Sequence, residues 1–344
     1  MRILYLSCHA ILEFDELSLF NRIGHYAFSP GAYVCPLNPG DNSLRPGLID
    51  IKYDEEDLAA WHSLASKYPG KDTKDYLTKE FVNRFDVVVV MHLPRWIQRN
   101  WHVFEDRPVV WRTIGQSIKN TEDSLRQYRE RGMKIVRYSP KEFNIPGYLG
   151  GDALIRFYKN PEEYKGWVGH DLKVVTLAQS MRKRGTHCNY QLFERVTRNF
   201  SRKLYGPGNE DTGILDGGKL SFKDMKAMLR NNRVYFYTGT HPASYTLNFI
   251  ESWMTGIPIV AIGPKNGNSP NYHNHELFEV ADLIHHGVNG FVSDDEQELK
   301  LCIQELLDNP ILAKQISDAG RASAIATFGK EKIETQWTEF LQTL

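Results

Sequence analysis

The chain has 344 residues, with 42 basic and 42 acidic side chains, so its formal net charge is zero. Proteins that bind nucleic acid or anionic membranes through charge over a whole surface carry a positive excess, so this balance argues against both classes. The length exceeds what one hydrophobic core usually supports, which predicts two domains.

Four cysteines are spread along the chain, and no two of them form a Cys-x-x-Cys pair. This spacing argues against a disulfide framework or a zinc knuckle and favours a reducing compartment. No run of apolar residues is long enough to cross a bilayer. The sequence therefore predicts a cytoplasmic protein without an integral membrane segment.

The first half of the chain contains short apolar runs rich in Val and Ile. They lie at residues 1–7, 87–91, 108–111 and 134–138, and an amphipathic stretch at 121–132 ends on a glycine. Nearly continuous apolar runs suit parallel strands that are buried on both faces. Strands that alternate with helices predict an α/β fold with a doubly wound parallel sheet.

Glycine and proline accumulate between residues 144 and 169, where we expect the connection between the domains. The strand and helix pattern then restarts. Strands are predicted at 172–178, 203–205, 234–237 and 258–262, and helices at 186–199, 221–231, 247–255, 296–307, 311–327 and 330–344. The predicted domains are residues 1–166 and 167–328, followed by a C-terminal helix at 329–344.

The most informative segment begins where the predicted strand ends at Tyr237. A loop of small and polar residues leads to a helix whose first turn offers unpaired N–H groups and the positive end of its dipole, and both favour a phosphate. Ser244 and Thr246 could add hydroxyl donors, and Glu251, one turn deeper, could accept hydrogen bonds from ribose hydroxyls. The alternative is that Glu251 is a solvated helix residue and that Ser244 or Thr246 only caps the helix.

Residues 250–263 resemble the C-terminal half-site of retaining GT-B glycosyltransferases of family 4. In that family a Glu-x7-Glu pattern leads into a helix that ends in Gly-[Val/Ile]-Pro-[Val/Ile]-Val. The second glutamate, which contacts ribose in the family, corresponds to Glu251. The first, which contacts the transferred sugar, is replaced by Ala243, and this departure leaves the sugar contact open.

Further segments resemble the same family in the same order, over roughly residues 172–340. Residues 282–292 are similar to its Gly-x-Asn-Gly-[Leu/Phe]-Val stretch, and the turn at 218–221, with Lys219, resembles one that helps hold the base. The last predicted helix resembles the family helix that crosses back to the N-terminal domain.

A basic cluster follows the first strand of the second half. Arg182 and Arg184 are similar in position to the family's Arg and Lys that bind the donor diphosphate, although the spacing is shorter. Fixed cations stabilise the charge that grows on a leaving diphosphate as the sugar–oxygen bond breaks. The alternative is a solvated basic turn.

The resemblance is weaker in the first half. Residues 86–92 resemble a family strand that ends near a histidine, here His92, and His9 follows the first strand. In a second strand the family histidine is replaced by Gly115, and Gln116 follows it. His92, Gln116 and Arg182 are therefore the candidates for catalysis, with a structural role as the alternative for each histidine.

Two further clusters contain residue types that could bind a ligand. Residues 272–276 include metal-like residue types, but substrate contact or a solvated loop is favoured over a metal. Tryptophans and arginines between Arg95 and Arg112 could stack on sugars or bases, whereas a core aromatic set with a basic surface is slightly preferred.

Together these features predict a GT-B fold of two Rossmann-like domains that face each other across a cleft. The resemblance implies transfer of a hexosyl or pentosyl group from a UDP- or GDP-type donor to an acceptor hydroxyl, with retention of configuration. It implies no cofactor, no catalytic metal and no side-chain nucleophile. The expected donor contacts are Arg182, Arg184, Lys219, Ser244, Tyr245, Thr246, Leu247 and Glu251.

Three alternatives stay open. The first is an epimerase or phosphorylase on the same fold, and the second is a nucleotide-sugar-binding protein without activity. The third is a transferase that glycosylates a modified DNA base, against which the zero net charge counts. The acceptor is a small molecule, a glycan or a nucleobase, and the protein is a monomer or a homodimer.

Overall fold

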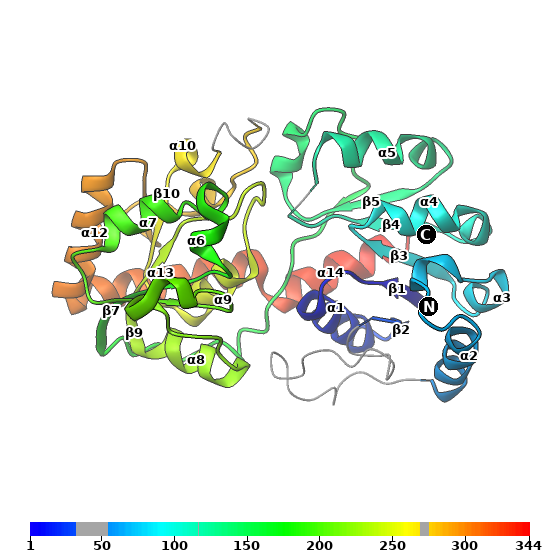
Figure 1. Cartoon of the computed structure of the whole chain (residues 1–344), viewed down its shortest axis with the longest axis horizontal. Helices are drawn as coiled ribbons and strands as arrows, with labels where there is room; N and C mark the ends of the chain where they lie inside the picture. Colours follow the sequence, from blue (N-terminus) through cyan, green and yellow to red (C-terminus); the bar gives the residue numbers. More distant parts are fainter. Residues whose placement is uncertain (32–53, 116, 269–274) are drawn as a thin grey trace. The chain divides into compact units, whose positions relative to one another are not determined.

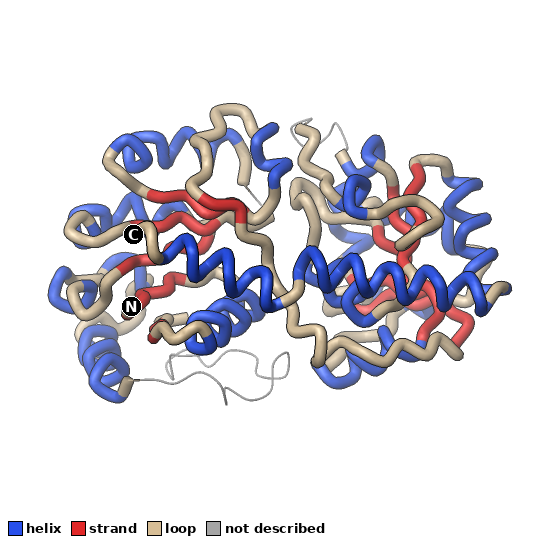
Figure 2. Tube along the Cα trace, turned by 180° about the vertical axis from the view of Figure 1, so that it is seen from behind, coloured by secondary structure: helices blue, strands red, loops and turns tan. Residues whose placement is uncertain are grey.

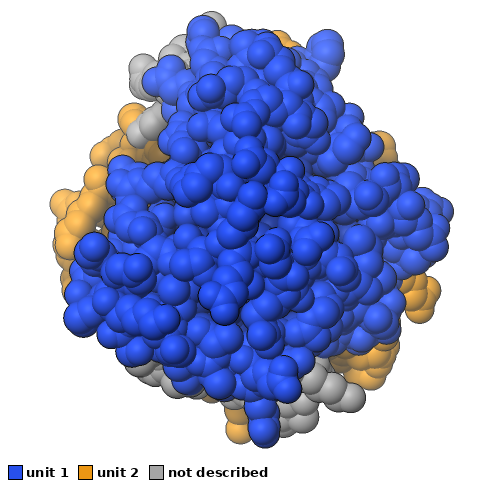
Figure 3. Space-filling model, turned by 90° about the vertical axis from the view of Figure 1, so that its right-hand side faces the viewer, with its two compact units in different colours: residues 1–157, 333–344 blue, residues 158–332 orange. Residues whose placement is uncertain are grey.

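A computed structural model describes residues 1–31, 54–115, 117–268 and 275–344. The chain forms two compact units, one of residues 1–157 with 333–344 and the other of residues 158–332 (Figure 3). The sequence placed the boundaries at residues 166 and 328. In each unit a parallel sheet lies between helices (Figures 1 and 2).

The sheet of the first unit has the strand order β2-β1-β3-β4-β5-β6. Its strands are β1 (Arg2–Leu6), β2 (Tyr26–Phe28), β3 (Val87–Met91), β4 (Val109–Arg112), β5 (Lys134–Arg137) and β6 (Ala153–Leu154). The helices of this unit are α1 (Ala10–Arg22), α2 (Glu55–Ser66), η1 (Thr73–Asp75), α3 (Lys79–Val82), α4 (Pro94–Phe104), α5 (Lys119–Glu130), η2 (Pro140–Asn144) and most of α14 (Lys330–Leu341). Every residue of β3 is buried, as the run of valines predicts for a central parallel strand.

The sheet of the second unit has the order β11-β10-β9-β7-β8. Its strands are β7 (Asp171–Leu177), β8 (Arg202–Tyr205), β9 (Asn232–Tyr237), β10 (Ile259–Ile262) and β11 (Phe291–Ser293). The helices are α6 (Met181–Arg184), η3 (Gly185–Cys188), α7 (Tyr190–Thr197), η4 (Glu210–Leu215), α8 (Phe222–Asn231), α9 (Leu247–Thr255), α10 (Pro264–Gly267), α11 (Val280–Leu283), α12 (Glu296–Asp308) and α13 (Pro310–Phe328). The predicted α/β class with doubly wound parallel sheets is confirmed.

One predicted helix is shorter than the sequence suggested. The pattern predicts a helix over residues 186–199, but α7 begins only at Tyr190. The preceding residues form the short helix η3, and Asn189 has a positive φ of 54° that interrupts the helical path. Left-handed backbone is tolerated by Asn, so the break falls at this residue.

The C-terminal helix α14 belongs from Ile333 onward to the first unit. Trp337 on this helix is fully buried, with its ring 5.0 Å from that of Phe20 on α1. It also lies 5.5 Å from the guanidinium of the buried Arg112. The last segment of the chain therefore completes the core that the first 157 residues begin.

Among the helices that the structure describes, none has the length and apolar character that a bilayer crossing requires.

Candidate functional site

The strand order of the second unit reverses between β7 and β9, which are neighbours in the sheet. Ligands of open α/β sheets bind outside the carboxyl ends of the strands at such a switch point. The loop after β7 leads into α6, and the loop after β9 leads into α9. The two segments that the sequence singled out therefore flank the expected binding position.

The loops after β7 and β8 are joined by a polar side chain. Asn209 is fully buried, and its side-chain amide donates to the carbonyls of Ala178 at 2.8 Å and Gly206 at 2.9 Å. A Cβ on Gly206, whose φ is 130°, would lie 2.5 Å from the Ala178 oxygen. Only glycine allows this close approach, so the edge of the site after β7 is held firmly.

The basic cluster lies on α6, directly after β7. Arg182 is exposed, and its Nη1 donates to the carbonyl of Asp211 at 2.6 Å. Arg184 is half-buried, and its Nη1 lies 3.5 Å from the carbonyl of Gln179. Neither guanidinium forms an ion pair with a carboxylate of the residues that the structure describes. Both cations are thus available to an anionic ligand at the end of β7.

The first turn of α9 lies beside the end of β7. The Asn248 side-chain amide donates to the carbonyl of Leu177, the last residue of β7. Thr246 is the N-cap, but its side chain makes no capping hydrogen bond and instead donates to the hydroxyl of Tyr237 at 3.2 Å. The first amides of α9, beginning with that of Leu247, therefore receive no side-chain cap, which suits an anion at this helix end.

Two of the expected donor contacts have buried side chains. Ser244 has no exposed surface and Tyr245 is 2 % exposed. The ring of Tyr245 packs edge-on against Phe328 at 5.2 Å, and the carbonyl of Ser244 accepts from the amide of Glu279. Since these side chains face the protein interior, any contact with a donor would come from their backbone. By contrast, Lys219 is exposed in the turn before α8.

Glu251 is 7 % exposed and lies in an ion pair that the sequence did not predict. Its Oε1 accepts from Nζ of Lys159 at 2.8 Å and from the hydroxyl of Tyr164 at 3.2 Å. Lys159 is itself only 1 % exposed. The lysine and the hydroxyl hold the carboxylate in one orientation through hydrogen bonds, one of them charge-assisted.

Lys159 follows Phe157 and Tyr158 in the segment that the sequence assigned to the domain connection. A lysine directly after two aromatic residues is a weak sign of burial. The pairing with Glu251 could not be predicted because the two residues are distant in the sequence and meet only through the fold.

The sheet of the first unit has its own switch point, between β1 and β3. His92 follows β3 with a positive φ of 59° and is 9 % exposed. Burial lowers the pKa of His92 to about 4, so its imidazole is neutral at physiological pH. Its Nδ1 has no hydrogen-bond partner among the described residues.

His9 follows β1 and caps α1, because its Nδ1 accepts from the amide of Leu12 at 3.4 Å. This supports the structural role that was the alternative for this histidine. Gln116, the third catalytic candidate, lies outside the described residues.

The cluster of tryptophans and arginines before β5 is largely structural. Trp111 and Arg112 are fully buried, and Arg112 forms an ion pair with Glu16 at 2.9 Å. The indole nitrogen of Trp111 donates to the carbonyl of His92 at 2.8 Å. Arg112 is therefore part of the core and cannot act as a surface cation.

Three solved structures with a similar backbone are described as a complex with UDP-glucose, a sucrose-phosphate synthase and a glycosyltransferase. HepE of Anabaena, in a structure described as a complex with UDP-glucose, has a TM-score of 0.70 and 15 % identity over 100 % of both chains. Sucrose-phosphate synthase of Thermosynechococcus elongatus has a TM-score of 0.67 and 12 % identity over 100 % of this chain and 98 % of that one. The chain has the GT-B fold.

A glycosyltransferase from Rickettsia africae also shares the GT-B arrangement, with a TM-score of 0.65 and 12 % identity over 98 % of this chain and 97 % of that one. No model of a protein family matches the sequence, and no curated protein matches it either.

Within the described part of this GT-B chain, no group of three or more His, Cys, Asp and Glu side chains is arranged to hold a metal ion. Of the metal-like residues at 272–276, only His275 and Glu276 are among those described.

Proposed function

We propose that this protein is a glycosyltransferase that moves a sugar from a nucleoside-diphosphate donor to an acceptor hydroxyl. The observation that carries the proposal is the grouping of three features at the β7/β9 switch point. These are the uncapped first turn of α9, the cations of α6 and the carboxylate of Glu251. The helix turn and the cations suit the diphosphate of a nucleotide, and the carboxylate suits its ribose. The fold is similar over the whole chain to that of HepE, which was solved in complex with UDP-glucose.

The donor diphosphate would lie at the N-terminus of α9, where Leu247 begins the helix, with Arg182 and Arg184 on its other side. As the sugar–oxygen bond breaks, negative charge grows on the diphosphate, and these fixed cations and amides stabilise it. Glu251 would accept hydrogen bonds from the ribose, and Lys219 would lie near the base. This distribution of charge neutralises the diphosphate without a metal ion.

We further propose a UDP-type donor, because the three similar structures of HepE are described as complexes with UDP, with UDP-glucose, or with UDP and glucose. The resemblance of residues 250–263 to family 4 supports transfer with retention. The first unit would present the acceptor, with His92 near the reacting atoms. Because His92 is neutral at physiological pH, it would donate or accept a hydrogen bond there rather than supply a charge.

Thermal unfolding with UDP, UDP-glucose and GDP-mannose tests donor binding directly. UDP compounds should raise the melting temperature, and Glu251→Gln, which keeps the side-chain shape, should weaken UDP binding about tenfold through loss of a charge-assisted hydrogen bond. Glu305→Ala, at an exposed position of α12, is the matched control and should bind like the parent protein. A melting temperature unmoved by every nucleotide would contradict the proposal.

Product analysis with each stabilising donor then separates transfer from epimerisation and from binding alone. Incubation with the donor and a mixture of acceptors should release UDP and form a glycoside. An epimerised donor without release of UDP would favour the epimerase alternative, and an unchanged donor that still binds would favour a binding protein.

A further inference from the structure

The first unit contains a pocket of about 850 Å³ that none of the donor contacts uses. It opens at the carboxyl ends of β1 and β3, because Ser7 and Cys8 follow β1 and Leu93 follows β3. This is the switch point of the first sheet, where an α/β fold places a ligand.

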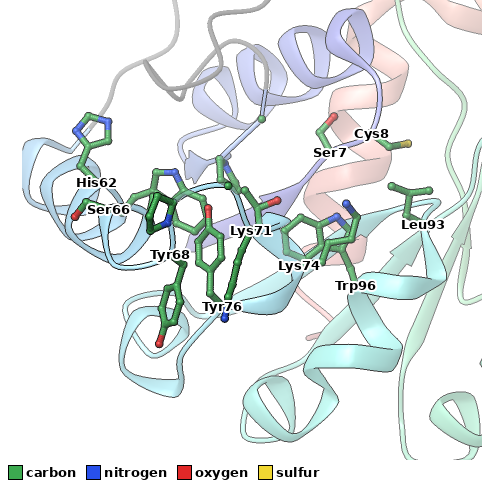
Figure 4. A pocket seen from close by; sticks show the side chains of 17 residues that line it. Ser7, Cys8, His62, Ser66, Tyr68, Lys71, Lys74, Tyr76, Leu93 and Trp96 are labelled. Atoms are coloured by element: carbon green, nitrogen blue, oxygen red, sulfur yellow. The ribbon is translucent and has the colours of Figure 1, made fainter.

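The described lining of this pocket is cationic and aromatic. It contains Lys71 and Lys74 and no carboxylate, together with Trp61, Tyr68, Tyr76 and Trp96. Figure 4 shows Tyr68, Tyr76 and Lys71 toward one end and Lys74, Trp96 and Ser7 toward the other. Aromatic faces pack against the C–H faces of sugar rings, whereas ammonium groups bind anions.

A tight turn fixes the first cation. The amide of Lys71 donates to the carbonyl of Tyr68 at 3.2 Å across Pro69 and Gly70, and Gly70 has a φ of 75°. Proline followed by a left-handed glycine is the pattern of a type II turn. The turn holds Nζ of Lys71 5.2 Å from the centre of the Tyr68 ring, and the Tyr68 ring stacks on Tyr76 at 5.4 Å. Lys71 forms no ion pair with any residue in the described segments.

The second cation lies deeper. Nζ of Lys74 is 5.3 Å from the centre of the Trp96 ring and 2.9 Å from Oδ1 of Asp72. Trp96 is 3 % exposed, and its Nε1 has no hydrogen-bond partner within the described part of the chain. An oxygen of a ligand that entered beside Lys74 would supply the missing acceptor.

We propose that this pocket binds the acceptor, and that the acceptor is a carbohydrate carrying a phosphate or carboxylate group that Lys71 recognises. The inference rests on the proposed transferase function for its role, but the binding itself depends only on the first unit. A neutral sugar would use the rings and leave the Lys71 ammonium without a counter-charge, so this cation selects an anionic sugar.

The test measures binding to the full-length protein saturated with UDP, so that the donor site is filled. Two matched pairs of probes are compared by isothermal titration calorimetry: trehalose 6-phosphate against trehalose, and cellobiouronic acid against cellobiose. The anionic member of at least one pair should bind at least fivefold more tightly, and which pair responds distinguishes phosphate from carboxylate. Raising the salt concentration should reduce that preference, since the site is open to solvent.

Variants assign the binding to the pocket. Lys71→Gln should reduce the preference for the anionic probe to less than twofold, and Tyr68→Ala should weaken every sugar that binds by about tenfold. Lys67→Gln replaces an exposed lysine that does not line the pocket and should change nothing.

Equal affinities within both pairs, no binding of any sugar, or binding unaffected by Lys71→Gln would each overturn the proposal. Tighter binding of a single-stranded oligonucleotide than of any sugar would also overturn it, in favour of a nucleobase acceptor. If UDP fails to bind while the anionic sugar still does, the transferase assignment fails and the pocket stands. If UDP binds and no sugar does, only the pocket assignment fails.

Discussion

Lys159 and Glu251 form a buried ion pair at the proposed ribose position. Glu251 is 7 % exposed and Lys159 is 1 % exposed, so each charge depends on the other. Removing one partner of such a pair typically costs about 3–5 kcal/mol, because the other charge is left buried without compensation.

Lys159→Met should therefore destabilise the protein and weaken UDP binding. Without the ammonium, the buried Glu251 carboxylate loses its counter-charge and the group that orients it, so UDP affinity should fall about tenfold. Urea unfolding and titration with UDP measure the two effects. Lys165→Met, which removes an exposed lysine paired with Glu162, is the control.

The double variant Lys159→Met with Glu251→Gln separates positioning from stability. It should recover most of the lost stability, because no charge is left unpaired, but it should not recover UDP affinity. If it recovers both, Glu251 does not contact the nucleotide.

His92 makes the stability of the first unit depend on pH. Its folded pKa of about 4 lies below the ordinary value of about 6.5, so the unfolded chain binds the proton more tightly. The stability that the neutral imidazole of His92 contributes is present above pH 6.5 and is lost as the pH falls toward 4. Between pH 7 and pH 5 this one residue should account for a loss of about 2 kcal/mol.

The variant His92→Asn tests this dependence, because Asn tolerates the left-handed backbone found there. The free energy of unfolding in urea should differ less between pH 7 and pH 5 for the variant than for the parent protein. An unchanged difference would mean that the pKa of His92 is the same in the folded and unfolded protein.

At the scale of the element, α9 depends on the residue that ends it. Gly256 has a φ of 90° and directs the chain into β10. A Cβ there would lie 3.0 Å from Oγ of Ser317 on α13, so alanine adds steric contact to backbone strain. The start of α9 forms the proposed phosphate site, and its end is held by this turn.

Gly256→Ala should destabilise the second unit by about 1–2 kcal/mol, as measured by urea unfolding. Gly287→Ala is the matched control, because its φ is 75° but no atom lies within 4 Å of its Cβ position. It should show the backbone strain alone. If Gly287→Ala lowered the free energy of unfolding as much as Gly256→Ala, the contact with Ser317 would contribute nothing to the destabilisation.

At the scale of the molecule, the first unit is assembled from two ends of the chain. Residues 333–344 complete a core that the first 157 residues begin, and Trp337 is the fully buried side chain that joins them. The second unit is continuous and includes the whole proposed donor site.

Trp337→Ala should therefore destabilise the first unit by about 3–5 kcal/mol, the usual cost of removing a large core side chain. UDP affinity, measured at a temperature where the variant is folded, should stay within twofold of the parent value. The exposed neighbour Glu339→Ala should alter neither property. A large loss of UDP affinity in Trp337→Ala would show that the donor site depends on the first unit.

Much of the fold is visible in the sequence because its signals are local. The run of valines predicts β3 without reference to the rest of the chain. A glycine and a proline likewise mark the end of α9 and the start of β10. The same local signals located the loops at the β7/β9 switch point and hence Arg182 and the start of α9. Parallel strands gather their carboxyl ends at one edge, so correct strands already bring these segments together.

The tertiary structure decided what depends on contacts between distant residues. It buried Arg112 against Glu16 and turned the side chains of Ser244 and Tyr245 into the interior. It also paired Lys159 with Glu251 and gathered Lys71, Tyr76 and Trp96 around one pocket. Whether a charged or polar side chain faces solvent, a ligand or a buried partner is set by packing between elements, which the local sequence does not encode.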